Sequence, residues 1–398
     1  MTKQLSNFKF NEISDEYDIS FELHNSHPSL ANAIRRIILS DVQTVGFKTE
    51  PLEESEINII KNSSSLHNEF LLHRLGMIPV HYQNIKQFNP NRYKFTLNVT
   101  NDTSQIRDIT TNDIQVIDLE MNEGQGGSVD NEAFFPKNPL TKEYILITKL
   151  KPNLEGEGEK INLEAKAMIG SGKMNSRWQP TSCAVYYNKK DESKIREELH
   201  KFLNLKKIEY GDTFESNKES LENEFNISES ERYFLVDETN TPNTFVFNIE
   251  SIGVIKSHLI LLDSLNIINS KLIELTKNMT ILKQNDSIHN LEFYESETVM
   301  NAFDIKIHHE NHTIGFLIQT YIISYFEKEL ISFIGYNNPH PLKDFIILRI
   351  SVSNHNKDTA LDYIINCIAL IQKDILKLIE DVNEKFGIKK RTLKIKKK

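Results

Sequence analysis

The sequence predicts an α+β protein that contains one strand–helix unit twice, with a β-rich domain inserted into the first copy. Residues 18–23, DISFEL, alternate apolar and polar side chains as a half-buried strand does, and the apolar helix LANAIRRIILS follows at 30–40. The same order returns downstream as an alternating strand at 303–307, a His-rich turn and an apolar helix from Ile314. A short extended run follows each helix, so the two segments are expected to be copies of one supersecondary unit.

Each half also contains a second apolar helix. At 256–277 and at 358–386, leucine and isoleucine recur at steps of three and four, which places one continuous apolar seam along each helix. We expect Asp358 or Thr359 to cap the start of the last helix, and Gly387 to end it. Two units with matching seams are expected to pair about an approximate two-fold axis, as the halves of a symmetric dimer do.

The side chains predicted to form this intrachain pairing lie on the apolar faces of the helices. They are Leu30, Ile34, Ile37, Ile38, Ile314, Gly315, Leu317, Ile318, Leu361, Ile364 and Ile368. Because both halves share one chain, a connecting segment holds them at an effective concentration of about millimolar. Pairing therefore requires no encounter between separate proteins.

A long insertion separates the first strand–helix unit from its second helix. It contains alternating strands such as YKFTLNVT and YILITKL, a glycine-rich turn and two charged helical stretches. The sequence predicts this division: a dimerisation domain at 1–50 and 235–277, an inserted β-rich domain at 51–234, a linker at 278–290, a second dimerisation domain at 291–388 and a basic tail at 389–398.

Composition limits the classes of function. The formal net charge is -9 although the tail carries seven Lys or Arg residues, and a broad nucleic-acid-binding face is usually basic, so protein partners are expected. Two cysteines, Cys183 and Cys367, are too few for a disulfide framework, which indicates a reducing compartment. No apolar run reaches 18 residues, so we expect an intracellular protein without a membrane contact.

The chain lacks a recognisable catalytic motif. His308 and His312 flank a turn, but Glu310 does not follow the first histidine directly, as the helical zinc-protease motif requires. Gly172 and Lys173 lack the spacing of a phosphate-binding loop. The carboxylate cluster that two-metal nucleotidyl transfer needs is also missing. We therefore expect no catalysis by this chain, no cofactor and no bound metal.

Two adjacent arginines interrupt the first apolar helix. A helical wheel places Asn32, Arg35 and Arg36 on the side opposite the apolar stripe. Arginine suits a docking surface because its planar fork can bind a carboxylate or two carbonyls at once. Exposed arginines that are simply solvated contribute little, and the pattern alone does not separate these two interpretations.

Several segments resemble the alpha-like subunit of multisubunit RNA polymerases, which is the third-largest subunit in eukaryotes and the bacterial alpha assembly domain. They are LANAIRRIILSDVQTVGF, NSSSLHNEFLLHRLGMIPV at 62–80, EAKAMIGSGKMNSRWQPTSCAVYY at 164–187 and FNIESIG at 247–253. Downstream, NAFDIKI, HENHTIGFLI and GYNNPHPLKDFIILRI resemble the small alpha-like partner subunit. The combination resembles a fusion of the two subunits, as in large cytoplasmic DNA viruses.

This resemblance implies a non-catalytic assembly platform for a DNA-directed RNA polymerase. The implied partners are the largest and second-largest subunits and small zinc-bearing subunits, with DNA and RNA contacted only through the complex. A viral origin would place the protein in the host cytoplasm and the virion. The implied docking residues are Asn32, Arg35 and Arg36 on one helix and Glu69, His73 and Arg74 on another. Family members commonly hold zinc with cysteines in the inserted domain, but residues 51–182 contain no cysteine.

Two other functions remain open from the residues alone. The tail at 389–398 suits a free-standing nucleic-acid-binding protein, whose affinity would fall steeply with salt and be lost on truncation. The His-rich turn suits a metal-dependent hydrolase, which would retain a stoichiometric metal ion on purification.

Overall fold

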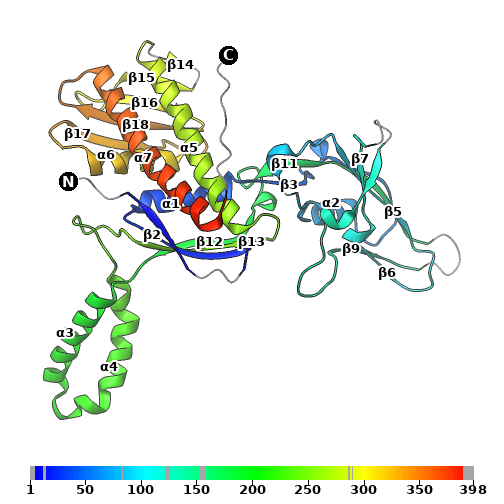
Figure 1. The fold of residues 1–398 in the computed structure, drawn as a ribbon, viewed down its shortest axis with the longest axis horizontal. Helices are drawn as coiled ribbons and strands as arrows, with labels where there is room; N and C mark the ends of the chain where they lie inside the picture. The colour runs from blue at the N-terminus through cyan, green and yellow to red at the C-terminus, as the bar shows by residue number, and fades with distance from the viewer. Residues whose placement is uncertain are drawn as a thin grey trace. The chain divides into compact units, whose positions relative to one another are not determined.

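The structure, a computed structural model, describes residues 5–11, 15–82, 84–121, 126–152, 158–285, 287–288 and 290–388. The chain forms two compact units, whose elements are labelled in Figure 1. Unit 1 comprises Met1–Ile37, Cys183–Ile249 and Leu261–Lys398, and unit 2 comprises Ile38–Ser182 and Glu250–Ile260. The basic tail predicted at 389–398 lies outside the described residues.

The first sheet of unit 1 has four strands in the order β1 (Asn7–Phe10), β2 (Asp18–His24), β13 (Phe245–Ser251) and β12 (Thr181–Asn188). Alternate residues of β2 and β13 are buried, because successive side chains of a strand point to opposite faces. Phe21 of β2 stacks on Phe247 of β13, with ring centroids 5.1 Å apart. Helices α1 (Pro28–Ser40) and α5 (Ser257–Leu282) complete this half.

The second half of unit 1 repeats the arrangement around a five-stranded antiparallel sheet. The strand order is β14 (Ser287–Ile288), β15 (Leu291–Glu295), β16 (Phe303–His308), β18 (Phe345–Val352) and β17 (Ile331–Asn337). Helices α6 (His312–Tyr325) and α7 (Lys357–Phe386) pack on it. The repeated strand–helix pattern is thus confirmed: β2 and α1 correspond to β16 and α6, and α5 corresponds to α7.

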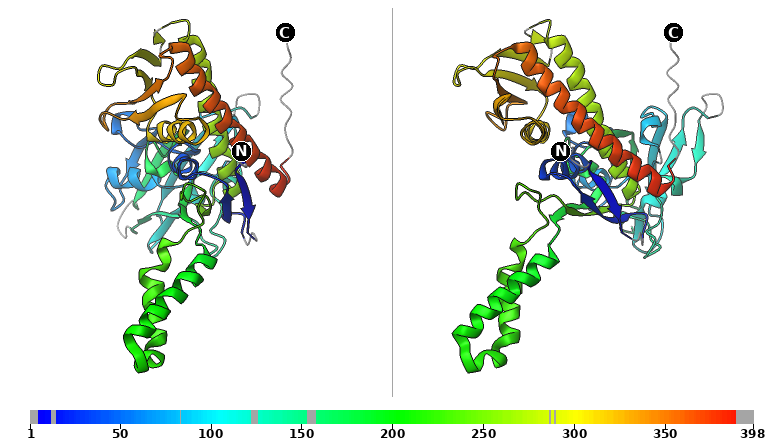
Figure 2. Two further views of the ribbon diagram at one scale, coloured as in Figure 1. Left: turned by 90° about the vertical axis from the view of Figure 1, so that its left-hand side faces the viewer. Right: turned by 60° about the vertical axis from the view of Figure 1, so that its left-hand side comes forward.

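The apolar seams predicted on α5 and α7 are buried. On α7 every seam position from Leu361 to Val382 is fully inaccessible, and on α5 the positions from Leu261 to Leu275 are buried. Figures 1 and 2 show the two helices side by side. The predicted caps are corrected in part: Asn356, not Asp358 or Thr359, caps α7 by accepting a hydrogen bond from the amide of Thr359 at 3.2 Å.

The C-terminal end of α7 is confirmed, because Gly387 adopts a left-handed φ of 62° that residues with a Cβ rarely adopt. The linker predicted at 278–290 is shorter than expected. Helix α5 continues to Leu282, so the first part of that segment is helical.

Side chains from the two halves meet within unit 1. The amide of Ser6, next to β1, donates to Asp374 Oδ1 of α7 at 3.2 Å, and the Tyr321 hydroxyl of α6 donates to Asp374 Oδ2 at 2.7 Å. The amide of Phe8 donates to Asp381 Oδ2 at 3.0 Å. The N-terminal strand therefore fastens the first half to the helices of the second. We call these contacts the N-terminal latch.

A helical hairpin leaves the first sheet after β12. Asp191 caps the start of helix α3 (Glu192–Tyr210), because its carboxylate accepts hydrogen bonds from the backbone amides of Ser193 and Lys194. Helix α4 (Phe214–Ser228) runs back antiparallel to α3. The inserted domain predicted at 51–234 is too long at its C-terminal end, because β12 pairs within the sheet of the first half and the hairpin belongs to unit 1.

Unit 2 is rich in β-structure, as expected. A five-stranded sheet has the order β4 (Ile57–Asn62), β10 (Lys160–Ala165), β5 (Tyr93–Thr100), β7 (Gln115–Asp118) and β8 (Gly127–Val129). Two strand pairs accompany it: β3 (Gln43–Phe47) with β11 (Ala167–Ser171), and β6 (Arg107–Thr110) with β9 (Leu146–Leu150). In its core the ring of Phe95 packs edge to face against the rings of Phe47 and Phe135. Helix α2 (Asn68–Gly76) inserts Leu71, Leu72 and Leu75 into the same core.

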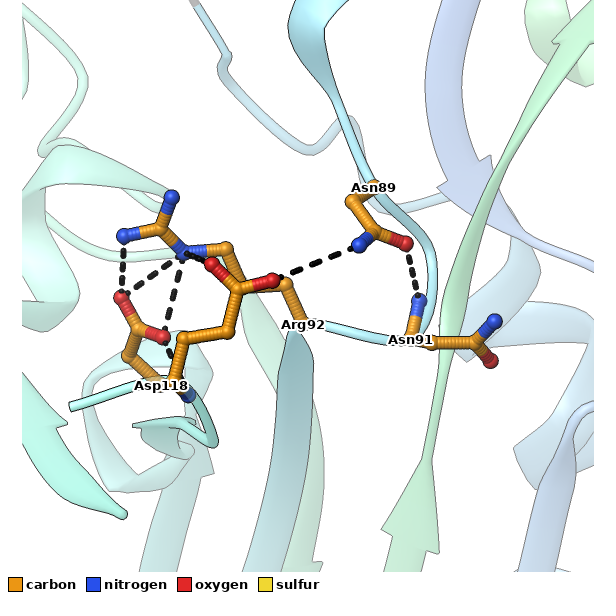
Figure 3. A network of polar contacts seen from close by, with 5 residues as sticks. Asn89, Asn91, Arg92 and Asp118 are labelled. Atoms are coloured by element: carbon orange, nitrogen blue, oxygen red, sulfur yellow. Dashed lines mark hydrogen bonds and ion pairs between the residues drawn. The ribbon is translucent and has the colours of Figure 1, made fainter. Parts of the chain in front are cut away.

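A polar network closes the end of β7 (Figure 3). The guanidinium of Arg92 donates from Nη2 to Asp118 Oδ2 at 2.7 Å and from Nε to Oδ1 at 3.1 Å. Asp118 is buried, and its hydrogen bonds from Arg92 hold the pKa of its carboxyl below the ordinary value. The Asn89 amide donates to Glu120 at 3.5 Å, which ties the preceding loop to the same network.

Acid is expected to destabilise unit 2 through Asp118. Its folded pKa lies below the unfolded value near 3.8, so its stabilisation is present above that pH and is lost as the pH falls through the folded pKa. Asp118→Asn should flatten this acid dependence, measured as the urea midpoint followed by the fluorescence of Trp178, the single tryptophan. Asp108→Asn, which removes an exposed ion pair with Lys149, is the matched control. An unchanged acid slope in Asp118→Asn would contradict this account.

Candidate functional site

The side of α1 that the sequence predicted for docking opens onto a groove in unit 1. Arg35 donates from Nη2 and Nε to Asn32 Oδ1, at 2.9 and 3.2 Å, so the two side chains are oriented together. Both line a shallow groove with residues of the edge strand β12 and of the segment after the hairpin. The other lining residues are Val185, Tyr186, Tyr187, Asn188, Lys190, Glu231 and Phe234.

This groove combines a cation with exposed apolar surface. The side chains of Val185 and Tyr187 are 45% and 56% exposed, and Tyr186 packs beneath them on Phe247 at 5.2 Å between ring centroids. Burial raises the pKa of Tyr186, and the nearby positive charge of Arg35 opposes that rise. An arginine beside aromatic surface is a composition that protein interfaces favour.

The helical wheel placed Arg36 on the same side of α1 as Asn32 and Arg35, but its side chain points elsewhere. Its Nε donates to Thr313 Oγ1 at 2.8 Å, and Thr313 stands in the first turn of α6 after the cap Asn311. Arg36 is therefore turned toward the second half and does not lie with Asn32 and Arg35 in the groove. Nearby within unit 1, Lys271 of α5 approaches Glu310 at 3.4 Å. Polar contacts thus accompany the buried seams where the halves meet.

The second set of predicted docking residues lies on the exposed face of α2. Glu69, His73 and Arg74 are all exposed, whereas the opposite face of the helix is buried. The local ion pair that their spacing allowed is not formed among the described residues; instead Arg74 Nη2 donates to the carbonyl of Leu146 at 2.9 Å.

Sequence reasoning missed two apolar residues on α2 and just after it. The side chain of Phe70 is 68% exposed and that of Met77 is 57% exposed, beside the charged residues of the same turns. Exposed apolar side chains that form a contiguous patch rimmed by polar residues often mark an interaction site. A phenylalanine directly after Glu69, out of step with the buried leucines, was the available signal.

The residues predicted to pair the two halves are buried without exception. The buried residues are Leu30, Ile34, Ile37, Ile38, Ile314, Gly315, Leu317, Ile318, Leu361, Ile364 and Ile368. Gly315 differs from the others in what it contacts. A Cβ there would lie 2.7 Å from the Tyr336 ring and 3.0 Å from Ile346, so this glycine brings α6 close to its own sheet. The pairing role of each remaining residue stays a prediction.

Comparison with known proteins decides the family. The RNA polymerase Rpb3/Rpb11 dimerisation domain matches residues 20–272, which is more than half of the chain, and a second domain of the same description matches residues 302–381. This chain belongs to the Rpb3/Rpb11 dimerisation domain family.

Similar proteins come from several organisms. The "DNA-directed RNA polymerases II, IV and V subunit 3" of Arabidopsis thaliana is 25% identical, over 66% of this chain and 88% of the relative. The "DNA-directed RNA polymerase subunit Rpo3" of Methanobrevibacter smithii is 29% identical, over 42% of this chain and 54% of the relative. A "Conjugation stage-specific protein" of Tetrahymena thermophila is 28% identical, over 43% of this chain. The chain spans 56% of that relative's length.

The predicted fold class is confirmed: two Rpb3/Rpb11 dimerisation domains with an α+β architecture occupy one chain. The first contains the first strand–helix unit, the insertion and most of α5, and the second runs from β16 into α7. The halves that meet through the N-terminal latch and the Arg36–Thr313 contact therefore carry the two matched domains.

Each histidine of the His-rich turn contacts a different residue. His308 bonds to Glu292 at 2.8 Å, His309 to Asp344 at 2.6 Å and His312 to Tyr336 at 3.3 Å, so the three rings are held by three separate partners. Among the described residues, no group of three or more His, Cys, Asp or Glu side chains is placed to hold a metal ion. Within the same residues, no helix has the length and apolar character needed to cross a bilayer.

Proposed function

We propose that the chain is a non-catalytic assembly subunit of a multisubunit DNA-directed RNA polymerase, and that it supplies both alpha-like partners from one polypeptide. The observation that carries this proposal is the presence of two dimerisation domains whose seams are buried and whose polar side chains contact each other inside one compact unit. Similarity to polymerase subunits from a plant and an archaeon supports the same assignment.

The proposed partners are the second-largest and largest polymerase subunits, together with small zinc-bearing subunits. The groove at Asn32 and Arg35 and the exposed face of α2 at Glu69, His73 and Arg74 are the docking surfaces we assign to the large subunits. Arg36 is included as a prediction, although it contacts Thr313 here. Such permanent interfaces are expected to bury more than about 2,000 Å² in total. We further propose a viral fusion of the two subunits, located in the host cytoplasm and the virion.

Co-expression with the second-largest subunit tests this proposal. The full chain should co-purify with that subunit at equal stoichiometry and resist high salt, because a large interface does not depend on surface charges alone. A chain that remains unbound under conditions in which the partner is folded would overturn the assignment. Metal content and salt-dependent DNA binding of the same preparation test the hydrolase and nucleic-acid-binding alternatives.

Arg35→Ala is expected to weaken capture of the second-largest subunit about tenfold, because arginine at an interface centre often contributes above 1 kcal/mol. Within the described residues, the hydrogen bonds of its side chain go to Asn32 of the same helix, so the fold should remain intact. Affinity measured by biolayer interferometry checks this result. Arg196→Ala, an exposed arginine on the hairpin, is the matched control and should bind as the native chain does. Equal affinities for both variants would exclude the groove as a docking site.

A further inference from the structure

Arg177 of unit 2 has a side chain that is almost fully removed from solvent. Its side chain is only 3% exposed, and it stands in the short turn Ser176–Trp178. Nη1 donates to Thr49 Oγ1, and Nη2 lies 3.2 Å from Glu50 Oε1. Removing an arginine from water is costly unless nearby groups compensate it, so this placement requires a reason.

The guanidinium lies against the last residue of α2. A Cβ added to Gly76 would overlap with Arg177 Nη1 and lie 2.7 Å from Thr49 Oγ1 and 3.1 Å from Arg177 Cζ. Only glycine leaves this space free. Three segments far apart in the sequence therefore meet at one point: the end of α2, the segment after β3 and the turn that contains Arg177.

The charge of Arg177 also suits its position. The last carbonyls of a helix carry a partial negative charge, and a cation at this end stabilises the helix. Gly76 is the final residue of α2, so the guanidinium stands at the negative end of that helix. Steric fit and electrostatics thus fix the C-terminal end of α2, a helix that exposes Phe70 and is followed directly by the exposed Met77.

We propose that Arg177 is a positioning residue that orients α2 for docking. It does not contact the partner itself; it acts through Gly76 and thereby sets the direction of the exposed face of α2. This inference rests on the proposed function, because it assigns α2 to a polymerase interface. It also predicts a mobile α2 end when the contact is broken, whether or not a partner is present.

Two measurements on the full chain test the two claims separately. Hydrogen exchange tests whether Arg177 holds the end of α2, and partner capture tests whether that orientation serves docking. Arg177→Met should speed amide exchange at 71–78 about tenfold and weaken capture of the second-largest subunit to a similar degree, since one buried charged contact is lost. Arg177→Lys, which keeps the charge but not the fork, should recover part of both effects. Arg232→Gln, in an exposed ion pair with Glu229, is the control. Trp178 fluorescence establishes that each variant is folded.

Gly76→Ala provides a test that leaves Arg177 in the chain. Alanine favours helices more than glycine does, yet it should speed exchange because its Cβ displaces the guanidinium. In the Arg177→Met background the same change should speed exchange less than it does in the native chain, because the guanidinium is gone and Thr49 Oγ1, 2.7 Å from the added Cβ, is the contact that remains. Unchanged exchange in Arg177→Met and Gly76→Ala overturns the positioning role. Faster exchange with undiminished capture overturns the link to docking, and a native chain that captures no partner overturns the proposed function instead.

Discussion

Replacing Ile368 with alanine is expected to lower the free energy of unfolding of unit 1 by about 2–5 kcal/mol, because a fully buried isoleucine is exchanged for a cavity. Ile368 is inaccessible to solvent in the middle of the α7 seam. Helix α6 packs on α7, and Figures 1 and 2 show α5 beside α7. The cavity would therefore open among helices of both halves. The surrounding helices have little freedom to collapse around the missing atoms.

The measurement is urea unfolding followed by far-ultraviolet circular dichroism, with Trp178 fluorescence recorded in parallel. The dichroism transition should move to lower urea, whereas the tryptophan transition should not, because Trp178 belongs to unit 2. Leu376→Ala on the same helix is the matched control, since Leu376 is 51% exposed and its loss should cost less than about 1 kcal/mol. Equal shifts for the two variants would refute the buried seam.

Breaking the N-terminal latch is the second substitution from which we expect a large loss of stability. Asp374→Ala removes an acceptor from Tyr321 and from the Ser6 amide and leaves both donors buried, which should lower stability by about 2–4 kcal/mol. The first strand should then detach, so amide exchange at residues 6–10 should rise before the rest of unit 1 unfolds. Asp15→Ala, at an exposed residue between β1 and β2, is the control. Native protection at 6–10 in Asp374→Ala would refute the latch.

The pH dependence of the latch has the opposite sign to that of Asp118. Burial raises the pKa of Asp374, and the hydrogen bonds from Tyr321 and Ser6 offset only part of the rise. A raised folded pKa means that the contribution of this carboxyl is complete below the unfolded value near 3.8 and is lost as the pH increases through the folded value. Asp374→Asn should therefore remove a decline in unit 1 stability with rising pH.

The elements with strong local periodicity could be predicted from the sequence. Helices α5 and α7 show an apolar residue at every third or fourth position, and their burial follows directly from that spacing. Strand β12 was misplaced because its local pattern does not say which sheet it joins; that choice depends on pairing with β13, some sixty residues away in sequence.

The candidate site could be predicted only in part, for a related reason. Asn32 and Arg35 line the groove on the side of α1 that the helical wheel indicated, whereas Arg36 reaches Thr313 across the edge of the apolar stripe. Arg177 had no local signal, because its contacts Thr49 and Gly76 are more than one hundred residues away. Side-chain partners that distant are fixed by tertiary structure, which a single sequence does not display.

Joining the two dimerisation domains in one polypeptide changes how the pair is produced. Separately encoded partners must be synthesised in matched amounts, because any surplus subunit would leave the apolar face of its helix exposed and prone to aggregation and proteolysis. Here each translated chain contains both dimerisation domains, so neither domain accumulates without its partner. Dilution cannot separate the two domains, and neither can be exchanged for a homologous domain from another protein.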